Sequence, residues 1–176
     1  MQEALQEMRV AIDALQPHGG DLAAVLGALR ARLDGLVADR GVRLVWQVDE
    51  LPSVDELTPS MVFSLQRIVL EAVGNALRHA NAKEVQFIAR TRGDGGVEIR
   101  IEDDGCGFNP EKTLGARGFA DMQTRARRIG AQIEISSRPQ EGTVVRMLIP
   151  RAPVARAAGS GDVKPAVPAA PAFQTA

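Results

Sequence analysis

The sequence Leu70-Glu71-Ala72-Val73-Gly74-Asn75-Ala76-Leu77-Arg78-His79 places a polar residue at every fourth position. Glu71, Asn75 and His79 therefore rise along one face of a helix, because residues four apart lie one above the other. The opposite face holds valine, leucine and alanine, which suits a protein core. We expect these residues to close a long amphipathic helix.

Two interpretations of this polar face are open from the spacing alone. A carboxylate one turn from a carboxamide suits Mg²⁺, because hard cations prefer oxygen ligands and the carboxylate can orient a water or take a proton. The same spacing is typical of a helix face that only contacts solvent. Gly74 favours the first interpretation, because glycine inside a helix costs ~1 kcal/mol against alanine. The close approach of another backbone or a ligand would explain it.

A second motif begins in the segment Val97-Glu98-Ile99-Arg100-Ile101-Glu102-Asp103, which alternates as a strand does. Asp103 continues the register of the apolar residues, where an unpaired carboxylate would be expensive. It either forms an Asx-turn with the amides of its own loop or binds the exocyclic amine of a ligand. In the second interpretation Gly105 and Gly107 let the backbone pass close to a flat ring.

Helices and hairpins alternate along the rest of the chain. This order predicts an α/β two-layer sandwich with a mixed sheet and the helices on one face. The expected helices cover residues 2–15, Asp21 to near Gly41, Thr58 or Ser60 to about Ala80, and a segment containing Phe119, Met122, Ala126 and Ile129. The expected strands cover residues 42–48, 84–91, 97–103, 131–136 and 143–149.

Composition excludes several classes of protein. The chain has 176 residues, 45% of them hydrophobic, and a net charge of −1, so neither nucleic acid nor an anionic membrane is an expected partner. No apolar run approaches the ~20 residues of a membrane span, and the N-terminus does not resemble a secretory signal. The single cysteine, Cys106, fits a reducing compartment such as the cytoplasm.

Two familiar phosphate-binding loops are absent from the sequence. A P-loop needs glycine directly before Lys-Thr, and Glu111 precedes Lys112 and Thr113. No Gly-x-Gly-x-x-Gly opens a helix after a strand, so a dinucleotide fingerprint is missing as well. The loop that ends at Arg117 nevertheless offers two cations, Lys112 and Arg117, to phosphates.

Taken in order, the motifs resemble the catalytic ATP-binding domain of sensor histidine kinases. This domain has the Bergerat fold and shares its superfamily with gyrase, the ninety-kilodalton heat-shock chaperone and the mismatch-repair ATPases. Residues 71–79 resemble the N-box, and residues 103–108 resemble the first glycine box. Residues 115–119 stand at the second glycine box, where Ala116 replaces a usual glycine. Gly142-Thr143 resembles the closing Gly-Thr, and the resemblance covers about residues 3–150.

The resemblance implies a role for each motif residue. Glu71 would be the catalytic acid that polarises an incoming imidazole, and Asn75 the Mg²⁺ ligand. Asp103 would bind the adenine amine, supported through water by the Thr143 hydroxyl. The residues expected to bind ATP are Asn75, Arg78, His79, Asp103, Gly105, Gly107, Lys112, Arg117, Gly118 and Thr143.

The phosphoacceptor histidine is not evident in this sequence. The chain has two histidines. His79 belongs to the N-box, and His18 lies between Pro17 and two glycines rather than on a helix before an acid. We therefore expect a kinase fragment whose acceptor histidine comes from another segment or chain. Residues 1–20 would be the end of a dimerisation helix, residues 21–150 the ATPase domain, and residues 151–176 a flexible Ala/Pro-rich tail.

The resemblance also implies partners. The short lid and the arginines after Met122 resemble the subfamily that works with response regulators of the LuxR or NarL type. The parent protein is expected to be a homodimer, and it could be a membrane-anchored sensor with this part in the cytoplasm. Two alternatives stay open: a binding module like the anti-sigma serine kinases, and a degenerate domain that no longer binds nucleotide. The stalk-like N-terminus argues against the first, and the presence of Glu71, Asn75 and Asp103 argues against the second.

Overall fold

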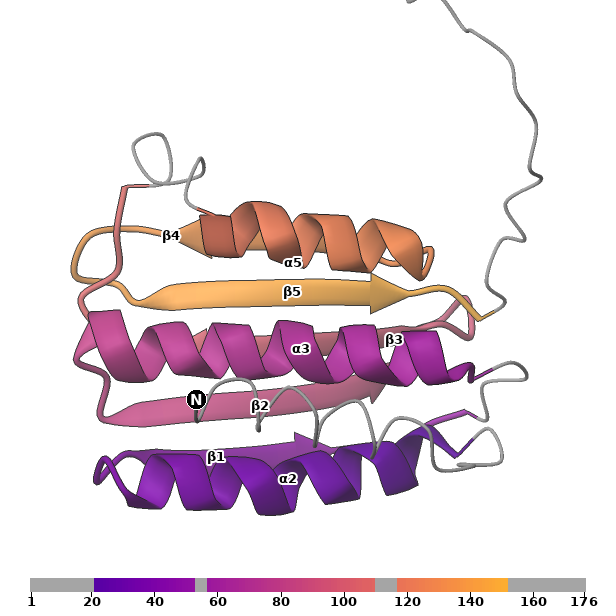
Figure 1. The fold of residues 1–176 in the computed structure, drawn as a ribbon, viewed down its shortest axis with the longest axis horizontal. Coiled ribbons are helices and arrows are strands. Elements are labelled where there is room, and N and C mark those ends of the chain that lie inside the picture. The colour runs from indigo at the N-terminus through magenta and orange to yellow at the C-terminus, as the bar shows by residue number, and fades with distance from the viewer. Residues whose placement is uncertain (1–20, 53–56, 110–116, 152–176) are drawn as a thin grey trace, which may run out of the picture.

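The computed structural model describes residues 21–52, 57–109 and 117–151. Figure 1 shows one sheet with the α-helices of the described residues lying against the same face. The elements are α2 (Leu22–Ala38), β1 (Arg43–Val48), α3 (Pro59–Asn75), the π-helix η1 (Ala76–Ala80), β2 (Glu84–Thr91), β3 (Val97–Asp103), α5 (Arg117–Arg128), β4 (Gln132–Ser137) and β5 (Thr143–Ile149). The predicted helix over residues 2–15 lies outside the described residues.

The sheet is mixed, and its strand order is β1-β2-β3-β5-β4. β1 pairs with β2 in parallel, because α3 carries the chain back across the sheet between them. The other neighbours are antiparallel. One end of the sandwich gathers the C-terminal ends of α3 and β3 and the N-terminal ends of α5 and β5 (Figure 1). The predicted two-layer α/β sandwich with a mixed sheet is confirmed.

The core lies between the sheet and the helices, and it follows the alternation of the strands. In β3 the side chains of Val97, Ile99 and Ile101 are at most 3% exposed. Phe87 on β2 is fully buried and stacks on Trp46 of β1, with the ring centroids 4.0 Å apart. Burial on one face only is what a strand with alternating apolar and polar residues produces.

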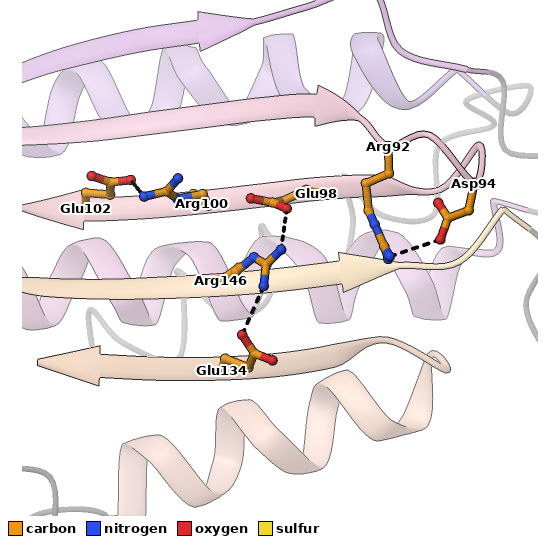
Figure 2. A network of polar contacts seen from close by, with 7 residues as sticks. All are labelled: Arg92, Asp94, Glu98, Arg100, Glu102, Glu134 and Arg146. Carbon is orange, nitrogen blue, oxygen red and sulfur yellow. Dashed lines mark hydrogen bonds and ion pairs between the residues drawn. The ribbon is translucent and has the colours of Figure 1, made fainter.

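The other face of the sheet carries charged residues that pair across strands (Figure 2). The Arg146 guanidinium lies between Glu98 on β3, at 2.8 Å, and Glu134 on β4, at 3.2 Å. The hydrogen bond from Arg146 lowers the pKa of the Glu98 carboxyl. Arg100 pairs with Glu102 along β3. This face is therefore suited to contact water, and the helices cover the opposite one.

The described helices begin as the sequence indicates. The Asp21 carboxylate accepts a hydrogen bond from the Ala24 amide at 3.0 Å and caps α2. Thr58, rather than Ser60, caps α3, since its hydroxyl accepts from the Met61 amide at 3.2 Å. The long helix does not stay regular to Ala80, because residues 76–80 form a π-helical turn. In the described part of the chain, no helix is both long and apolar enough to cross a lipid bilayer.

Two neighbouring residues of β3 test this one-sided arrangement. Ile99→Ala should lower the free energy of unfolding by about 2–5 kcal/mol, because Ile99 is 0% exposed and its removal leaves a cavity. Arg100→Ala should cost less than about 1 kcal/mol, because a partly exposed ion pair adds little. Urea denaturation of both variants measures the two values. Similar losses for the two variants would contradict the described orientation of β3.

Candidate functional site

A cavity of about 430 Å³ opens where α3, η1, β3, β5 and α5 meet, a size typical of small-molecule sites. It brings together eight of the eleven residues singled out in the sequence, which are Glu71, Asn75, Arg78, His79, Asp103, Gly107, Gly118 and Thr143. Gly105 lies beside it in the loop after β3 and is not among the lining residues. Lys112 lies outside the described residues, and of Arg117 only the backbone at the start of α5 is described.

One wall of the cavity is polar and comes from the end of α3. The Arg78 guanidinium donates to the Asn75 side-chain oxygen at 3.2 Å and lies 3.8 Å from the Glu71 carboxylate. A Cβ on Gly118 would stand 2.6 Å from the Glu71 Oε1 atom, the oxygen that faces Arg78, so the first turn of α5 lies directly against this carboxylate. Spacings of four and then three residues thus gather an acid, an amide and a cation in one place.

Gly74 has a different neighbour from the one expected. A close approach does occur there, but the partner is the side chain of Arg78 on the same helix. A Cβ at position 74 would lie 2.8 Å from one guanidinium nitrogen and 3.2 Å from the other. Glycine therefore leaves room for the guanidinium to fold back toward Asn75.

The π-helical turn η1 ties the polar wall to the loop after β3. The Ala80 carbonyl accepts a hydrogen bond from the Cys106 amide at 2.7 Å, and the His79 carbonyl lies 3.5 Å from the Cys106 sulfur. A Cβ on Gly105 would stand 2.4 Å from that of Ala80, so only glycine fits between loop and turn. Carbonyls at the end of the helix thus find partners in the loop, and π-turns are frequent at functional sites.

Asp103 and Asp104 stand in opposite environments. Asp103 is partly buried and lines the cavity, and burial raises the pKa of its carboxyl. Asp104 is exposed, and its carboxylate accepts from the amides of Glu84 at 2.9 Å and Lys83 at 2.8 Å. These hydrogen bonds lower the pKa of Asp104, the bond from Glu84 most. Asp104 fixes the loop to the start of β2, and Asp103 stays available inside the cavity.

The Asx-turn considered for Asp103 is present. Its carboxylate accepts from the Gly105 amide at 3.0 Å and also has a hydrogen bond with the Thr143 hydroxyl. Thr143 is the cross-strand partner of Asp103 in the β3–β5 pairing. The carboxyl still lines the cavity, so the turn and ligand binding do not exclude each other.

Gly107 is required by the protein itself. Its φ is +57°, and a Cβ there would lie 2.0 Å from the Arg138 carbonyl oxygen. The loop after β3 therefore presses against the turn between β4 and β5. This contact gives the glycine a role that does not depend on the close approach of a ring, which stays a prediction.

The sequence argument missed the apolar lining and one hydroxyl. Phe108 and Phe119 stack with their centroids 5.1 Å apart, and Ile101 and Val145 also line the cavity. Ser137 bonds to the loop and to the β4–β5 turn. A signal for Ser137 did exist, because it continues the inward-facing register of β4.

Comparison with known proteins fits this geometry. The sequence profile of the histidine kinase-, DNA gyrase B- and HSP90-like ATPases matches residues 62–153. The chain belongs to this ATPase family. The matched region includes all of the cavity-lining residues. The resemblance drawn from the N-box and the glycine boxes is therefore confirmed at the level of the family.

Two curated relatives of this ATPase domain are nitrate sensors or their homologues. The chain is 37% identical over 102 residues to the sensor protein NarQ homolog of Haemophilus influenzae, covering 57% of this chain and 18% of that protein. It is 35% identical over 119 residues to the nitrate/nitrite sensor protein NarQ of Escherichia coli, covering 67% and 21%. The chain thus spans about a fifth of the length of these relatives.

A solved structure shares the fold of this ATPase domain. The histidine kinase domain of the blue-light activated histidine kinase from Erythrobacter litoralis EL346 superposes with a TM-score of 0.63. The sequences are 19% identical, and the match covers 82% of this chain and 74% of that chain. At this identity the likeness concerns the fold alone.

Replacing Asp103 by asparagine tests the environment of its carboxyl. Ionisation is harder in the folded than in the unfolded state, so wild type loses stability as the pH rises above about 4 through the folded-state pKa. Asp103→Asn cannot ionise and can still accept from Gly105. It should be at least as stable as wild type at pH 7, with an advantage that shrinks toward pH 4. Urea denaturation between pH 4 and 7.5 measures the difference.

Asp104→Asn is the matched control, because its folded-state pKa is lowered. This variant should be less stable than wild type by a constant amount between pH 7.5 and about 4, and its deficit should shrink only below about pH 4, so the denaturation of this pair is followed to lower pH. If both variants showed the same dependence on pH, the opposite environments of the two aspartates would be refuted.

Proposed function

We propose that this chain is the ATP-binding catalytic domain of a sensor histidine kinase. It transfers the γ-phosphoryl group of ATP to a histidine supplied by another segment or chain. The observation that carries the proposal is the division of one cavity into two ends. A partly buried carboxyl on an apolar floor stands at one end, and an acid, an amide and a guanidinium stand at the other.

The apolar end suits adenine. Ile101, Val145 and Phe108 offer flat and aliphatic surface for a ring. Asp103 supplies the acceptor that an exocyclic amine needs, and its backbone and hydroxyl partners hold it in one orientation. A charge-assisted hydrogen bond in such a place contributes more than one in water.

The polar end suits a magnesium-bound triphosphate. Asn75 and Glu71 provide hard oxygen donors, and the Arg78 guanidinium already lies on the Asn75 oxygen, so this position accepts a cation. Few protein ligands suffice, because Mg²⁺ keeps waters and takes phosphate oxygens as well. Bound by Asn75, Mg²⁺ would neutralise charge on the phosphates.

The chemistry asked of the protein is mostly positioning. A bond forms between an imidazole nitrogen and the γ-phosphorus as the bond to the β,γ-bridging oxygen breaks, and ADP leaves. Glu71 accepts a hydrogen bond from the other imidazole nitrogen and makes the ring a better nucleophile. Arg78 lines the cavity at this end and offsets negative charge on the phosphates, and His79, which also lines the cavity, is a phosphate-side residue.

The rest of the parent protein follows from this assignment. We infer an acceptor histidine on a dimerisation helix of which residues 1–20 are the end, an ATPase domain over residues 21–150, and an Ala/Pro-rich tail over residues 151–176. Similarity to the NarQ sensors supports a response regulator of the LuxR or NarL type and a membrane-anchored parent with this domain in the cytoplasm. We further propose that the parent is a homodimer. The convergence of Glu71, Asn75 and Asp103 on one cavity disfavours a degenerate domain.

Calorimetry with Asn75→Ala tests the magnesium end. Wild type should bind ATP more tightly with Mg²⁺ than with a chelator, and the variant should lose this difference while it keeps the weaker, metal-free affinity. Gln123→Ala removes an exposed amide from α5 and should behave as wild type. An equal gain from Mg²⁺ in wild type and Asn75→Ala would disprove the ligand role. A wild-type chain that binds no ATP would refute the proposed function.

A further inference from the structure

A serine stands in the apolar register of β4. Ile133, Ile135 and Ser137 share the face that turns toward the helices, and Ser137 is only 9% exposed. A buried hydroxyl is costly unless its hydrogen bonds are made. Ser137 should therefore have partners that justify its position.

The partners of Ser137 come from both sides of the adenine end. Its hydroxyl oxygen accepts from the Phe108 amide at 2.9 Å, in the loop after β3. The hydroxyl donates to the Gly142 carbonyl at 2.7 Å, in the turn before β5. The Thr143 hydroxyl oxygen lies 3.3 Å away. One side chain thus joins the loop after β3 to the start of β5.

Each of these hydroxyls has one proton, which determines which hydrogen bonds it can donate. Ser137 has a single proton to donate, and the shorter contact assigns it to Gly142. Ser137 then acts only as an acceptor toward its other neighbours. Thr143 also has a single proton: donated to Asp103, it leaves Ser137 and Thr143 in packing contact only. Ser137 therefore acts on the site through the Phe108 amide and the Gly142 carbonyl.

Backbone contacts also hold the loop after β3 against the turn between β4 and β5. The Gln140 amide donates to the Cys106 carbonyl at 2.7 Å. Gly142 has a φ of +75°, and a Cβ there would lie 1.9 Å from the Asp103 carbonyl oxygen. The loop and the turn touch directly, and within the described residues Ser137 supplies a side-chain bond between them at the floor of the cavity.

We propose that Ser137 is a positioning residue for base recognition. It fixes the Phe108 backbone and the Gly142 carbonyl, and through Gly142 the adjoining Thr143, around Asp103, so that the adenine end is formed before nucleotide arrives. Ser137 itself is not among the residues that line the cavity. The inference deepens the proposed function and rests on it, because Asp103 is assigned there to the adenine amine.

The test compares Ser137→Ala with Ser136→Ala, which removes an exposed hydroxyl from the adjacent position on the other face of β4. NMR titration of the Asp103 carboxyl needs no nucleotide. Without Ser137, the Gly142 carbonyl loses its side-chain partner, and the turn that carries the following Thr143 is held less well. The hydrogen bond of the Thr143 hydroxyl to Asp103 then weakens, and the pKa of Asp103 rises further. The other charged and titratable side chains that line the cavity are those of Glu71, Arg78 and His79. Both variants leave these side chains unchanged, together with Asp104 in the same loop as Asp103.

Calorimetry supplies the second readout. Ser137→Ala should bind ATP about tenfold more weakly, equivalent to the loss of roughly one hydrogen bond, with little change for GTP. Thr143→Val by itself should raise the pKa of Asp103, and the double variant Thr143→Val/Ser137→Ala should have the same Asp103 pKa as Thr143→Val. If Ser137→Ala does not fold, Ser137→Cys fills the same space with a weaker hydrogen-bonding group and gives the same readouts.

The outcomes separate the two proposals. A lower melting temperature with an unchanged Asp103 pKa and unchanged ATP affinity would overturn the positioning role and leave Ser137 a structural residue. A wild-type chain that fails to bind ATP would refute the proposed function. The Asp103 titration would still decide whether Ser137 acts on this carboxyl.

Discussion

The site is organised around a carboxyl group on the apolar side of the sheet. Asp103 ends a strand whose preceding inward-facing residues are hydrophobic, and burial there disfavours its ionised form. The Gly105 amide and the Thr143 hydroxyl offset part of this cost. The conformation of the surrounding loop follows from these bonds, including the glycines that let it press against η1 on one side and the β4–β5 turn on the other. A ligand that donates a hydrogen bond would complete the arrangement.

The two ends of the cavity are linked through the same loop. The Cys106 amide holds the π-helical turn that carries Arg78 and His79. The following residues reach Ser137 and the β4–β5 turn. At the polar end, Gly118 lies against Glu71, so α5 and α3 meet at the acid assigned to catalysis. Binding at one end is therefore positioned to affect the other through short, direct contacts.

Local patterns predicted much of the fold. The bounds of β2, β3 and β5 agree with the alternation of apolar and polar residues, and Thr58 and Asp21 cap helices as their residue types indicate. The π-turn over residues 76–80 could not be predicted, because alanine, leucine and arginine all favour a regular helix. The turn is in contact with a loop distant in sequence, through the Cys106 amide and the Ala80 carbonyl, and local propensity carries no signal of such a contact.

Motif spacing predicted most of the cavity lining, but not the pairing that brings Thr143 to Asp103. That pairing depends on the register of two strands separated in sequence by a helix and a strand. Ser137 shows the same limit, since its inward position is visible in the sequence and its three partners are not.

The most direct measurement is a calorimetric titration of ATP and GTP against wild type and Asp103→Asn. Wild type should bind ATP and reject GTP, whose ring carries a carbonyl where adenine has its amine. The variant should lose about 1.5–3 kcal/mol of ATP binding, roughly 10- to 100-fold, because an amide NH₂ replaces a charged acceptor. Its weak binding of GTP should hardly change. Equal affinity of wild type for ATP and GTP would contradict the assignment of Asp103 to the adenine amine.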